Sequence, residues 1–239
     1  MRGAGLDLDV SEGRIADPQA GYRHLFPPAV LERYEIYSYR NAAGILATGF
    51  PAQFATLLEI LTALRITRTQ IRTPGGSKGP IVRHIETLFP PDWVEARINA
   101  DLHVRLVDAR GGGTIRRYMR RGYLDGHRID FVNGKVALDL EWNSKDQTYD
   151  RDLAAFAAFY EAGAIDVGII LTRGAALDSA FFRSLGRVLD KDGREGREDV
   201  YRKFGASTTW MGKLLYRLDA GRNGGCPVLA IGITPACVD

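Results

Sequence analysis

The amino-acid sequence predicts an α/β fold in which a central mixed β-sheet is flanked by helices. Two runs with β-strand character, His127 to Val132 and Lys135 to Trp142, surround Asn133-Gly134, a dipeptide that favours a tight hairpin turn. A continuous apolar run from Ile165 to Leu171 follows, and such runs are typical of strands that are buried on both faces. Segments with helical periodicity precede and follow these strands, so we expect helices to cover the sheet.

The segments before the hairpin are assigned by their periodicity. Residues Glu35 to Tyr39 form a short β-rich run, and the apolar residues between Pro51 and Leu64 recur at helical spacing. Thr73 to Pro80 is a Gly-rich loop, and its last proline suits the first turn of a further helix. Alternating residues from Leu102 to Val107 predict another strand.

The segments after the hairpin continue the mixed pattern. Leu153, Phe156 and Tyr160 mark an amphipathic helix before the buried apolar strand. We then expect two further helices, a charged loop between them and a final strand. Their ranges are 178–189 for the first helix, 190–198 for the loop, 209–218 for the second helix and 228–233 for the strand.

Composition limits the class of protein. The 239 residues are 45% hydrophobic and 26% charged, values that exclude a disordered chain or a disulfide scaffold. Residues 1–30 are rich in Gly, Pro and Asp, so we expect a loosely structured N-terminal arm followed by a single domain over 31–239. Two cysteines, Cys226 and Cys237, indicate a reducing cytoplasm, and charges that interrupt the apolar stretches argue against a membrane span.

Basic residues are clustered although the net charge is only +3. One group lies between Arg65 and Arg83 without an intervening acid, and a second group lies between Arg116 and Arg121. Each cluster is either a solvated face or a contact surface for a polyanion.

The strongest chemical signal is a set of carboxylates on the hairpin. Side chains alternate along a strand, so Asp139 and Glu141 lie on one face, opposite to the apolar face of Leu138 and Leu140. If Asn133-Gly134 is the turn, Asp130 lies on the same acidic face, diagonal to Asp139 and about 7 Å from it. Like charges at this separation repel one another unless a cation lies among them, and carboxylates are natural ligands of Mg²⁺. The sequence therefore predicts a metal site formed by Asp130, Asp139 and Glu141.

A simpler interpretation stays open at this level. The three acids could form the solvated face of a two-stranded ribbon, with Arg128 opposite Asp139 as their charge partner. They could also hold a structural ion without any catalysis.

The residues that carry this pattern resemble a known family. Ile129-Asp130, eight residues and then Asp139-Leu140-Glu141 are similar to the active site of PD-(D/E)xK nucleases, specifically type II restriction endonucleases of the BamHI/BglII-like group. The resemblance extends to the Gly-rich loop, the hairpin, Trp142-Asn143-Ser144-Lys145-Asp146, Asp150-Arg151-Asp152-Leu153 and Val167 to Arg173. It implies a restriction-endonuclease-like fold, with residues 31–239 as one nuclease domain.

The resemblance also implies a role for each acid. Asp130 matches the metal-binding aspartate of the family, Asp139 matches the second acidic ligand, and Glu141 occupies the place of the usual lysine. Because Glu141 is an anion, it would bind metal or accept a proton from the attacking water. Asn143 and Lys145 are candidates for catalytic support. In an alternative frame Glu141 and Asn143 are the second acid and the third residue, but Glu141 would then lie about 13 Å along the strand from the point opposite Asp130.

Together the residues and the resemblance predict a Mg²⁺-dependent, sequence-specific endonuclease. It would cleave double-stranded DNA into 5′-phosphate and 3′-hydroxyl ends and act as a homodimer on a palindromic site. Hydroxyl and ammonium groups near the Gly-rich loop and before the last helix are candidate DNA contacts, and one of the three hydroxyl residues there is expected to be the N-cap of that helix. The candidates are Ser77, Lys78, Lys203, Ser207, Thr208, Thr209 and Lys213. A non-catalytic DNA-binding protein, or a repair or recombination nuclease acting on branched or damaged DNA, are the alternatives.

Overall fold

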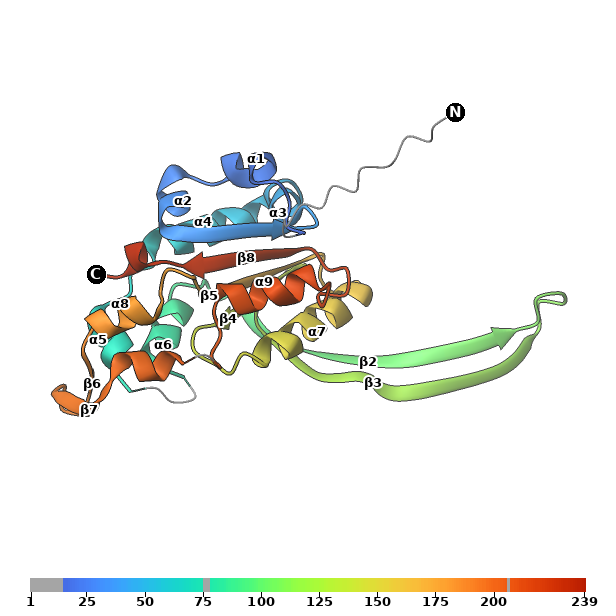
Figure 1. Ribbon diagram of the computed structural model, residues 1–239. Helices are drawn as coiled ribbons and strands as arrows, with labels where there is room; N and C mark the ends of the chain where they lie inside the picture. Colours follow the sequence, from blue (N-terminus) through green and yellow to red (C-terminus); the bar gives the residue numbers. More distant parts are fainter. Residues whose placement is uncertain (1–14, 75–77, 206) are drawn as a thin grey trace, which may run out of the picture.

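A six-stranded mixed sheet forms the centre of the molecule (Figure 1). The computed structural model describes residues 15–74, 78–205 and 207–239. The three middle strands run parallel to one another, and the outer pairings at both sides are antiparallel. In sheet order the strands are β1 Tyr34–Tyr39, β8 Val228–Ile233, β5 Val167–Arg173, β4 Val136–Glu141, β3 Thr114–Asn133 and β2 Val94–Val107.

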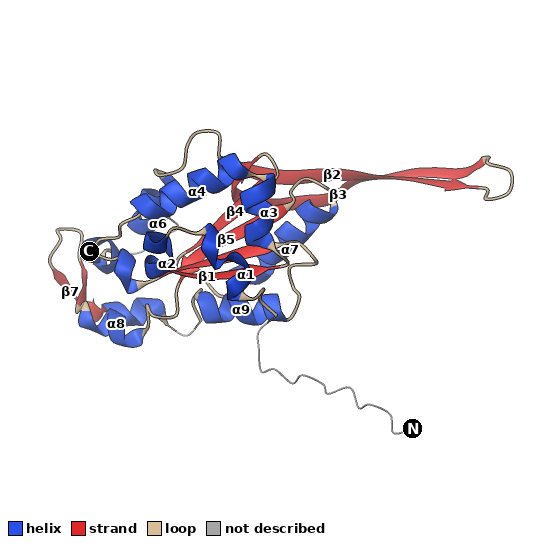
Figure 2. Cartoon of the chain, turned by 90° about the horizontal axis from the view of Figure 1, so that it is seen from above, coloured by secondary structure: helices blue, strands red, loops and turns tan. Residues whose placement is uncertain are grey.

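Helices cover both faces of this sheet, and each face has its own apolar core. On one face Leu138 and Ile169 pack among residues of α3, α4 and α6. On the other face Ala137 and Ile170 pack against α7 and α9 (Figure 2). The α-helices are α1 Gln19–Tyr22, α2 Pro28–Arg33, α3 Ala42–Gly49, α4 Pro51–Ala63, α5 Arg68–Arg72, α6 Pro80–Glu86, α7 Thr148–Glu161, α8 Ser179–Ser184 and α9 Met211–Asp219. This two-sided covering confirms the predicted fold class.

Short elements complete the chain. A second, two-stranded sheet pairs β6 Arg187–Leu189 with β7 Glu195–Asp199. The described residues also form the 3₁₀ turns η1 Arg23–Leu25, η2 Val200–Phe204 and η3 Pro235–Cys237. The helix expected over 178–189 is therefore wrong in its second half, because Gly186 has a φ of 76° and the chain turns there into β6.

The described part of the N-terminal arm is folded against the domain. Tyr22, Phe26 and Val30 are buried in the core that α3 and α4 share. The Tyr22 hydroxyl donates a hydrogen bond to the carbonyl of Ile36 at 3.0 Å. Residues 15–30 thus differ from the loosely structured arm that their composition predicts, because three large apolar side chains provide enough burial to order them. The division into an arm and one nuclease domain stays a prediction.

The hairpin forms where it was predicted, but its register differs. Asn133 pairs with Val136, so the two loop residues are Gly134 and Lys135. Only Gly134 of these two has a positive φ, 58°, which is the pattern of a turn with glycine at its first central position. The shift moves every cross-strand pair by two residues, and therefore leaves the predicted faces unchanged.

Two helices joined by a sharp bend have a composition that resembles a membrane segment. Helices α3 and α4 together pass a length and hydropathy test for a span, but they meet at 113°. Among the described residues no single helix is long and apolar enough to cross a membrane.

Candidate active site

Asp130 and Asp139 lie where β3 and β4 separate. The last cross-strand pair on this side is Phe131 with Leu138, so Asp130 and Asp139 are the next residues of the two strands. The amide of Asp130 donates to Oδ1 of Asp139 at 2.9 Å, and the amide of Leu140 donates to Oδ2 of Asp130 at 3.0 Å. The two carboxylates thus accept from backbone amides at the point where the ladder opens. The two residues follow the same cross-strand pair and are not the diagonal neighbours predicted from sequence.

Asp139 is enclosed, whereas Asp130 is open to solvent. Only 4% of Asp139 is exposed, and its Oδ2 is buried without a hydrogen-bond partner among the described residues. Burial, followed by the charges of Asp152 and Asp130, raises the pKa of Asp139 well above its ordinary value. A buried carboxylate oxygen without a donor is costly, so this atom is suited to a cation.

Asp152 of α7 approaches the same acids from the helix that covers them. It is 1% exposed, and its Oδ1 accepts from Arg151 Nη2 at 2.9 Å. Its other oxygen, Oδ2, is also buried without a partner among the residues that the structure describes. The pKa of Asp152 is raised by burial and lowered in part by Arg151.

Glu141, the last residue of β4, is the fourth member of the acidic cluster, beside Asp130, Asp139 and Asp152. Its Oε2 accepts from the Thr148 hydroxyl at 3.3 Å, and its Oε1 lies 3.7 Å from Nη2 of Arg151. Burial and the charge of Asp152 raise the pKa of Glu141 to about 8. The buried Glu141 carboxyl therefore holds a proton more tightly than an ordinary glutamate in the metal-free protein.

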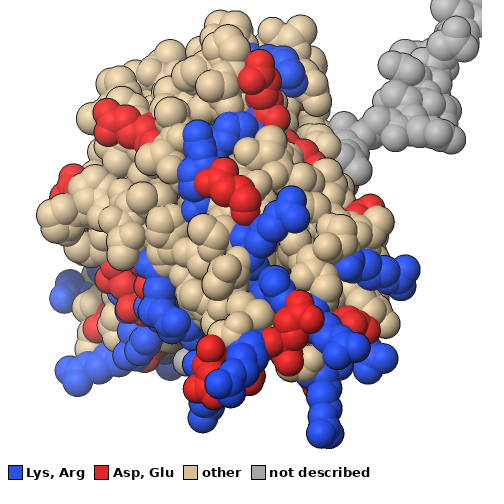
Figure 3. Space-filling model, turned by 90° about the vertical axis from the view of Figure 1, so that its left-hand side faces the viewer, with Lys and Arg blue, Asp and Glu red and all other residues tan. Residues whose placement is uncertain are grey.

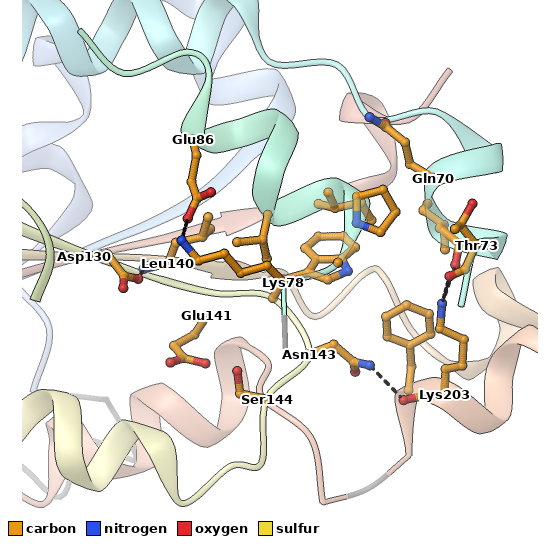
Figure 4. A pocket seen from close by; sticks show the side chains of 17 residues that line it. Gln70, Thr73, Lys78, Glu86, Asp130, Leu140, Glu141, Asn143, Ser144 and Lys203 are labelled. Atoms are coloured by element: carbon orange, nitrogen blue, oxygen red, sulfur yellow. Dashed lines mark hydrogen bonds and ion pairs between the residues drawn. The ribbon is translucent and has the colours of Figure 1, made fainter. Parts of the chain in front are cut away.

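An open cavity lies beside these acids (Figure 4). It has a volume of about 420 Å³, and Asp130 and Glu141 are among its lining residues. Lys78 faces them across the cavity, where its Nζ forms an ion pair with Glu86 at 2.7 Å. The Lys78 side chain remains 63% exposed, so it is free to exchange this partner for a phosphate.

Asn143 and Lys145 follow Glu141 along the chain. Asn143 lines the cavity, its Nδ2 donates to the carbonyl of Lys203 at 3.1 Å, and its Oδ1 is buried without a partner in the described ranges. Lys145 is exposed, and its backbone forms a β-bridge with Thr208. Asn143 therefore lies at the site, and Lys145 lies at its margin.

The two other lysines predicted to contact DNA are already engaged. Nζ of Lys203 donates to the carbonyls of Ile71 at 2.9 Å and Thr73 at 2.5 Å, and burial lowers its pKa to about 8. Lys203 thus supports the start of the Gly-rich loop instead of presenting a free ammonium group. Lys213 forms an ion pair with Asp146 at 2.7 Å.

The hydroxyl residues before α9 do not cap it. The helix begins at Met211, and its N-cap is Trp210, which provides no side-chain cap. Thr208 donates to the carbonyl of Gly205 at 2.8 Å, Thr209 is fully buried, and Ser207 is exposed. The expected N-cap is therefore wrong, because the polypeptide continues for one residue in an extended conformation before the helix starts. Ser77 lies outside the described residues.

Arg173 holds this segment in place from β5. It is 4% exposed and donates to Oγ1 of Thr208 at 3.0 Å and to the carbonyl of Thr209 at 3.1 Å. Its guanidinium carbon lies 5.2 Å from the ring of Phe182 and 5.3 Å from the ring of Phe204. Arg173 thus positions two of the predicted DNA contacts.

The sequence analysis assigned no role to Asp152, although the spacing of the buried residues of α7 includes this aspartate. Tyr149, Asp152, Leu153 and Phe156 follow the spacing of one buried helix face, and all four are buried. A carboxylate on an otherwise apolar stripe is a buried charge that needs compensation. Glu86 was also missed, because only the fold brings α6 to the cavity.

The acidic residues fit a Mg²⁺ ion that is completed by other ligands. Within the described ranges no group of three or more His, Cys, Asp or Glu side chains is placed to hold a metal ion by itself, the predicted set of Asp130, Asp139 and Glu141 included. Mg²⁺ commonly uses one or two carboxylates and takes its other ligands from water and phosphates. The unpartnered Oδ2 of Asp139 beside the open Asp130 matches this requirement. Arg128, the alternative charge partner of the acids, instead lies 3.4 Å from Glu95.

Basic side chains gather near this end of the molecule. Figure 3 shows many Lys and Arg side chains in the lower half of the face, interspersed with acids. The basic side chains of this face are therefore partly balanced by the acids among them.

The family described as restriction endonuclease BglII/BglIII matches residues 34–233, which include all strands of the central sheet. No curated protein matches the chain.

Proposed function

The chain belongs to the BglII/BglIII family of restriction endonucleases, and we propose that it hydrolyses phosphodiester bonds with Mg²⁺ and leaves 5′-phosphate and 3′-hydroxyl ends. Family membership makes it a type II site-specific deoxyribonuclease whose substrate is DNA. The proposal of metal-dependent hydrolysis rests on the pair Asp130 and Asp139. Asp139 has a buried carboxylate oxygen that has no donor among the described residues.

Asp130 and Asp139 are the residues that would hold the ion, and Glu141, which the sequence also predicts as a ligand, would lie beside them. Oδ1 of Asp130 and Oδ2 of Asp139 are not used by the hydrogen bonds that join the strands, so both are available as ligands. When bound, Mg²⁺ lowers the pKa of water and neutralises charge that develops on the phosphate and on the departing 3′ oxygen.

Glu141 is proposed to take the proton of the attacking water. Its carboxyl lines the cavity, and burial together with the charge of Asp152 makes it hold a proton more tightly than an ordinary glutamate, because these raise its pKa. Arg151, 3.7 Å away, stabilises the anionic form that accepts the proton. Asn143 is proposed to orient the substrate phosphate, because it lines the same cavity.

Lys78 is proposed to bind a DNA phosphate at the opposite wall of the cavity. Its exposed ion pair with Glu86 contributes little stability, so exchanging Glu86 for a phosphate costs little. Ser77, Ser207, Thr208, Thr209 and Lys213 remain proposed contacts to the same duplex. For Lys203 the two hydrogen bonds to backbone carbonyls favour a supporting role.

A plasmid cleavage assay tests the metal and the end chemistry. We expect discrete fragments from supercoiled plasmids with Mg²⁺, none with EDTA, and ends that DNA ligase rejoins without prior phosphorylation. Asp130→Asn should abolish cleavage, whereas Asp166→Asn, which alters only a surface ion pair with Lys135, should retain it. Full cleavage in EDTA, or by Asp130→Asn, would refute the proposed metal site.

We also propose that the enzyme acts as a homodimer. Cutting both strands of a palindromic site requires two copies of one active site related by a two-fold axis. Light scattering during size-exclusion chromatography in EDTA should give a complex whose mass is the mass of the duplex plus about twice the 26.4 kDa chain mass. A one-to-one complex that cuts both strands would contradict the proposal.

The alternative of a nuclease for branched or damaged DNA can be tested with the same preparation. Family membership favours linear duplex as the substrate. Faster cleavage of four-way junctions than of plasmid fragments would favour the alternative.

A further inference from the structure

Strands β2 and β3 form a long two-stranded ribbon that leaves the body of the protein (Figures 1 and 2). β2 has 14 residues and β3 has 20, and their pairing continues to Val107 opposite Thr114. At roughly 3.3 Å per residue, β2 alone extends over about 45 Å. Ile98 and Ile129 are buried near the base, whereas residues 105–123 are all exposed.

The outer part of this ribbon, residues 102–121, is strongly basic. It contains six arginines and a single acidic residue, Asp108, so its positive excess is larger than the +3 of the whole chain. We call these residues the distal ribbon. The arginines are Arg105, Arg110, Arg116, Arg117, Arg120 and Arg121.

The arrangement of these charges is unfavourable in the protein alone. Arg105 lies directly opposite Arg117 across the ribbon, and like charges in this position repel. Within the described residues, none of the six arginines of the distal ribbon forms an ion pair, whereas near the base Arg97 binds Asp125 at 2.6 Å. A surface that leaves opposed arginines uncompensated is suited to a polyanion.

Apolar and aromatic side chains lie between these arginines. Ile115, Tyr118 and Met119 are 70%, 48% and 45% exposed. The guanidinium carbon of Arg116 lies 5.7 Å from the ring centre of Tyr118, and this interaction helps to orient it. A two-stranded ribbon fits the major groove of duplex DNA, where apolar groups contact thymine methyls and arginines reach phosphates or guanines.

The active-site strand itself carries the distal ribbon. Asp130 is near the base of β3, and Arg121 and Arg116 are 9 and 14 residues away on the same strand. At the strand rise these distances are about 30–45 Å, and at roughly 3.4 Å per base pair this corresponds to about one helical turn of DNA.

We propose that the distal ribbon is a second DNA-contact surface, which binds the duplex about one helical turn away from the cleaved bond. This inference rests on the proposed function of the Asp130 site, because the ribbon and that site would share one duplex. Its contribution is binding and not chemistry. The ribbon would therefore raise affinity for long duplexes over short ones.

Binding measurements with duplexes of two lengths test this inference. Fluorescence anisotropy in EDTA would use mixed-sequence duplexes of about 12 and about 40 base pairs at several salt concentrations. Variant R105Q/R116Q/R117Q/R120Q/R121Q should bind the long duplex at least about tenfold more weakly, with a salt slope reduced by about 0.9 for each phosphate that it no longer neutralises. Its affinity for the short duplex should stay within about twofold, since the body of the protein still binds DNA non-specifically.

Two further variants keep the experiment decisive. Lysine at the same five positions retains the charge and should restore most of the long-duplex affinity. Replacing residues 103–119 with Asn-Gly removes four of the six arginines and shortens the ribbon without touching the body. This variant should lose most of the long-duplex affinity that the glutamine variant loses, even if the glutamine variant misfolds locally.

Several outcomes would overturn the inference. The first is an unchanged long-duplex affinity in both the glutamine and the shortened variants. The second is a reduction in affinity that is equal for the long and the short duplex. The third is a change of oligomeric state in these variants without DNA, which would make the ribbon a self-association surface. Because no metal is present and no bond is cleaved, these results are independent of whether Asp130→Asn abolishes cleavage.

Discussion

Asp130 and Asp139 each bond to the partner strand at the place where β3 and β4 part. The amide of Asp130 donates to Asp139 at 2.9 Å, and the carboxylate of Asp130 accepts from the amide of Leu140 at 3.0 Å. These bonds replace the ladder that ends at Phe131 and Leu138. They fix both carboxylates without using all their oxygens, so the fold preorganises an acidic pair that has coordination sites left.

Asp139→Asn removes the charge of this residue but keeps its hydrogen bond to the partner strand. The asparagine Oδ1 can still accept from the amide of Asp130, but the buried negative charge is removed. We expect cleavage to fall by at least about 100-fold and the metal-free melting temperature at high pH to rise, because burial and the charges of Asp152 and Asp130 disfavour the ionised form of Asp139 and raise its pKa. Plasmid cleavage and differential scanning calorimetry measure both. A variant that cleaves at the parent rate would exclude Asp139 as a ligand.

Divalent cations should stabilise the folded protein. We expect about 10 mM Mg²⁺ or Ca²⁺ to raise the melting temperature by several degrees at pH 8 and by less at pH 6, since metal binding requires deprotonated carboxylates. The same salts should leave the melting temperature of Asp130→Asn nearly unchanged. An equal shift for the parent and the variant would mean that the ions act elsewhere.

Glu141 should make stability of the metal-free protein depend on pH. Its pKa rises from the ordinary 4.5 to about 8 in the folded state, so between these values the folded protein holds a proton that the unfolded chain releases. This contribution is complete below about pH 4.5 and disappears as the pH rises through about 8. Glu141→Gln should therefore flatten the decline in melting temperature between about pH 5 and pH 8. A decline as steep as that of the parent would assign it to other groups.

Arg173→Met should destabilise the segment before α9. The variant leaves the carbonyls of Leu177 and Thr209 without their donor, and each unsatisfied buried group costs about 1–3 kcal/mol. We expect a lower melting temperature and faster amide hydrogen exchange over residues 207–209. Arg183→Met, which alters an exposed arginine of α8, is the control. Unchanged exchange over 207–209 would show that Arg173 does not order this segment.

Lys78 and Lys203 should respond differently to substitution. Lys78→Ala is expected to weaken DNA binding and reduce the salt slope by about 0.9, with little change in stability. Lys203→Met is expected to lower stability by about 1–3 kcal/mol, because Ile71 and Thr73 lose a donor. Chemical denaturation and anisotropy measure the two effects. The opposite pattern would reverse the roles assigned to them.

The sequence by itself determined the elements around the site and the face on which its acids lie. Alternation along β4 places Asp139 and Glu141 on one side, and a glycine turn makes β3 and β4 neighbours. These features follow from backbone geometry within a few residues, so they can be predicted without knowledge of long-range packing.

Only the tertiary structure decided the rest. The two-residue shift of the hairpin, the approach of Asp152 from α7 and the hydrogen bonds of Lys203 to backbone carbonyls all join segments that local periodicity treats separately. The length of the β2–β3 ribbon was missed for a related reason. Alternation marks only Leu102 to Val107, and most of the outer part of β3 is exposed on both faces, so no apolar face extends the pattern along the rest of the ribbon.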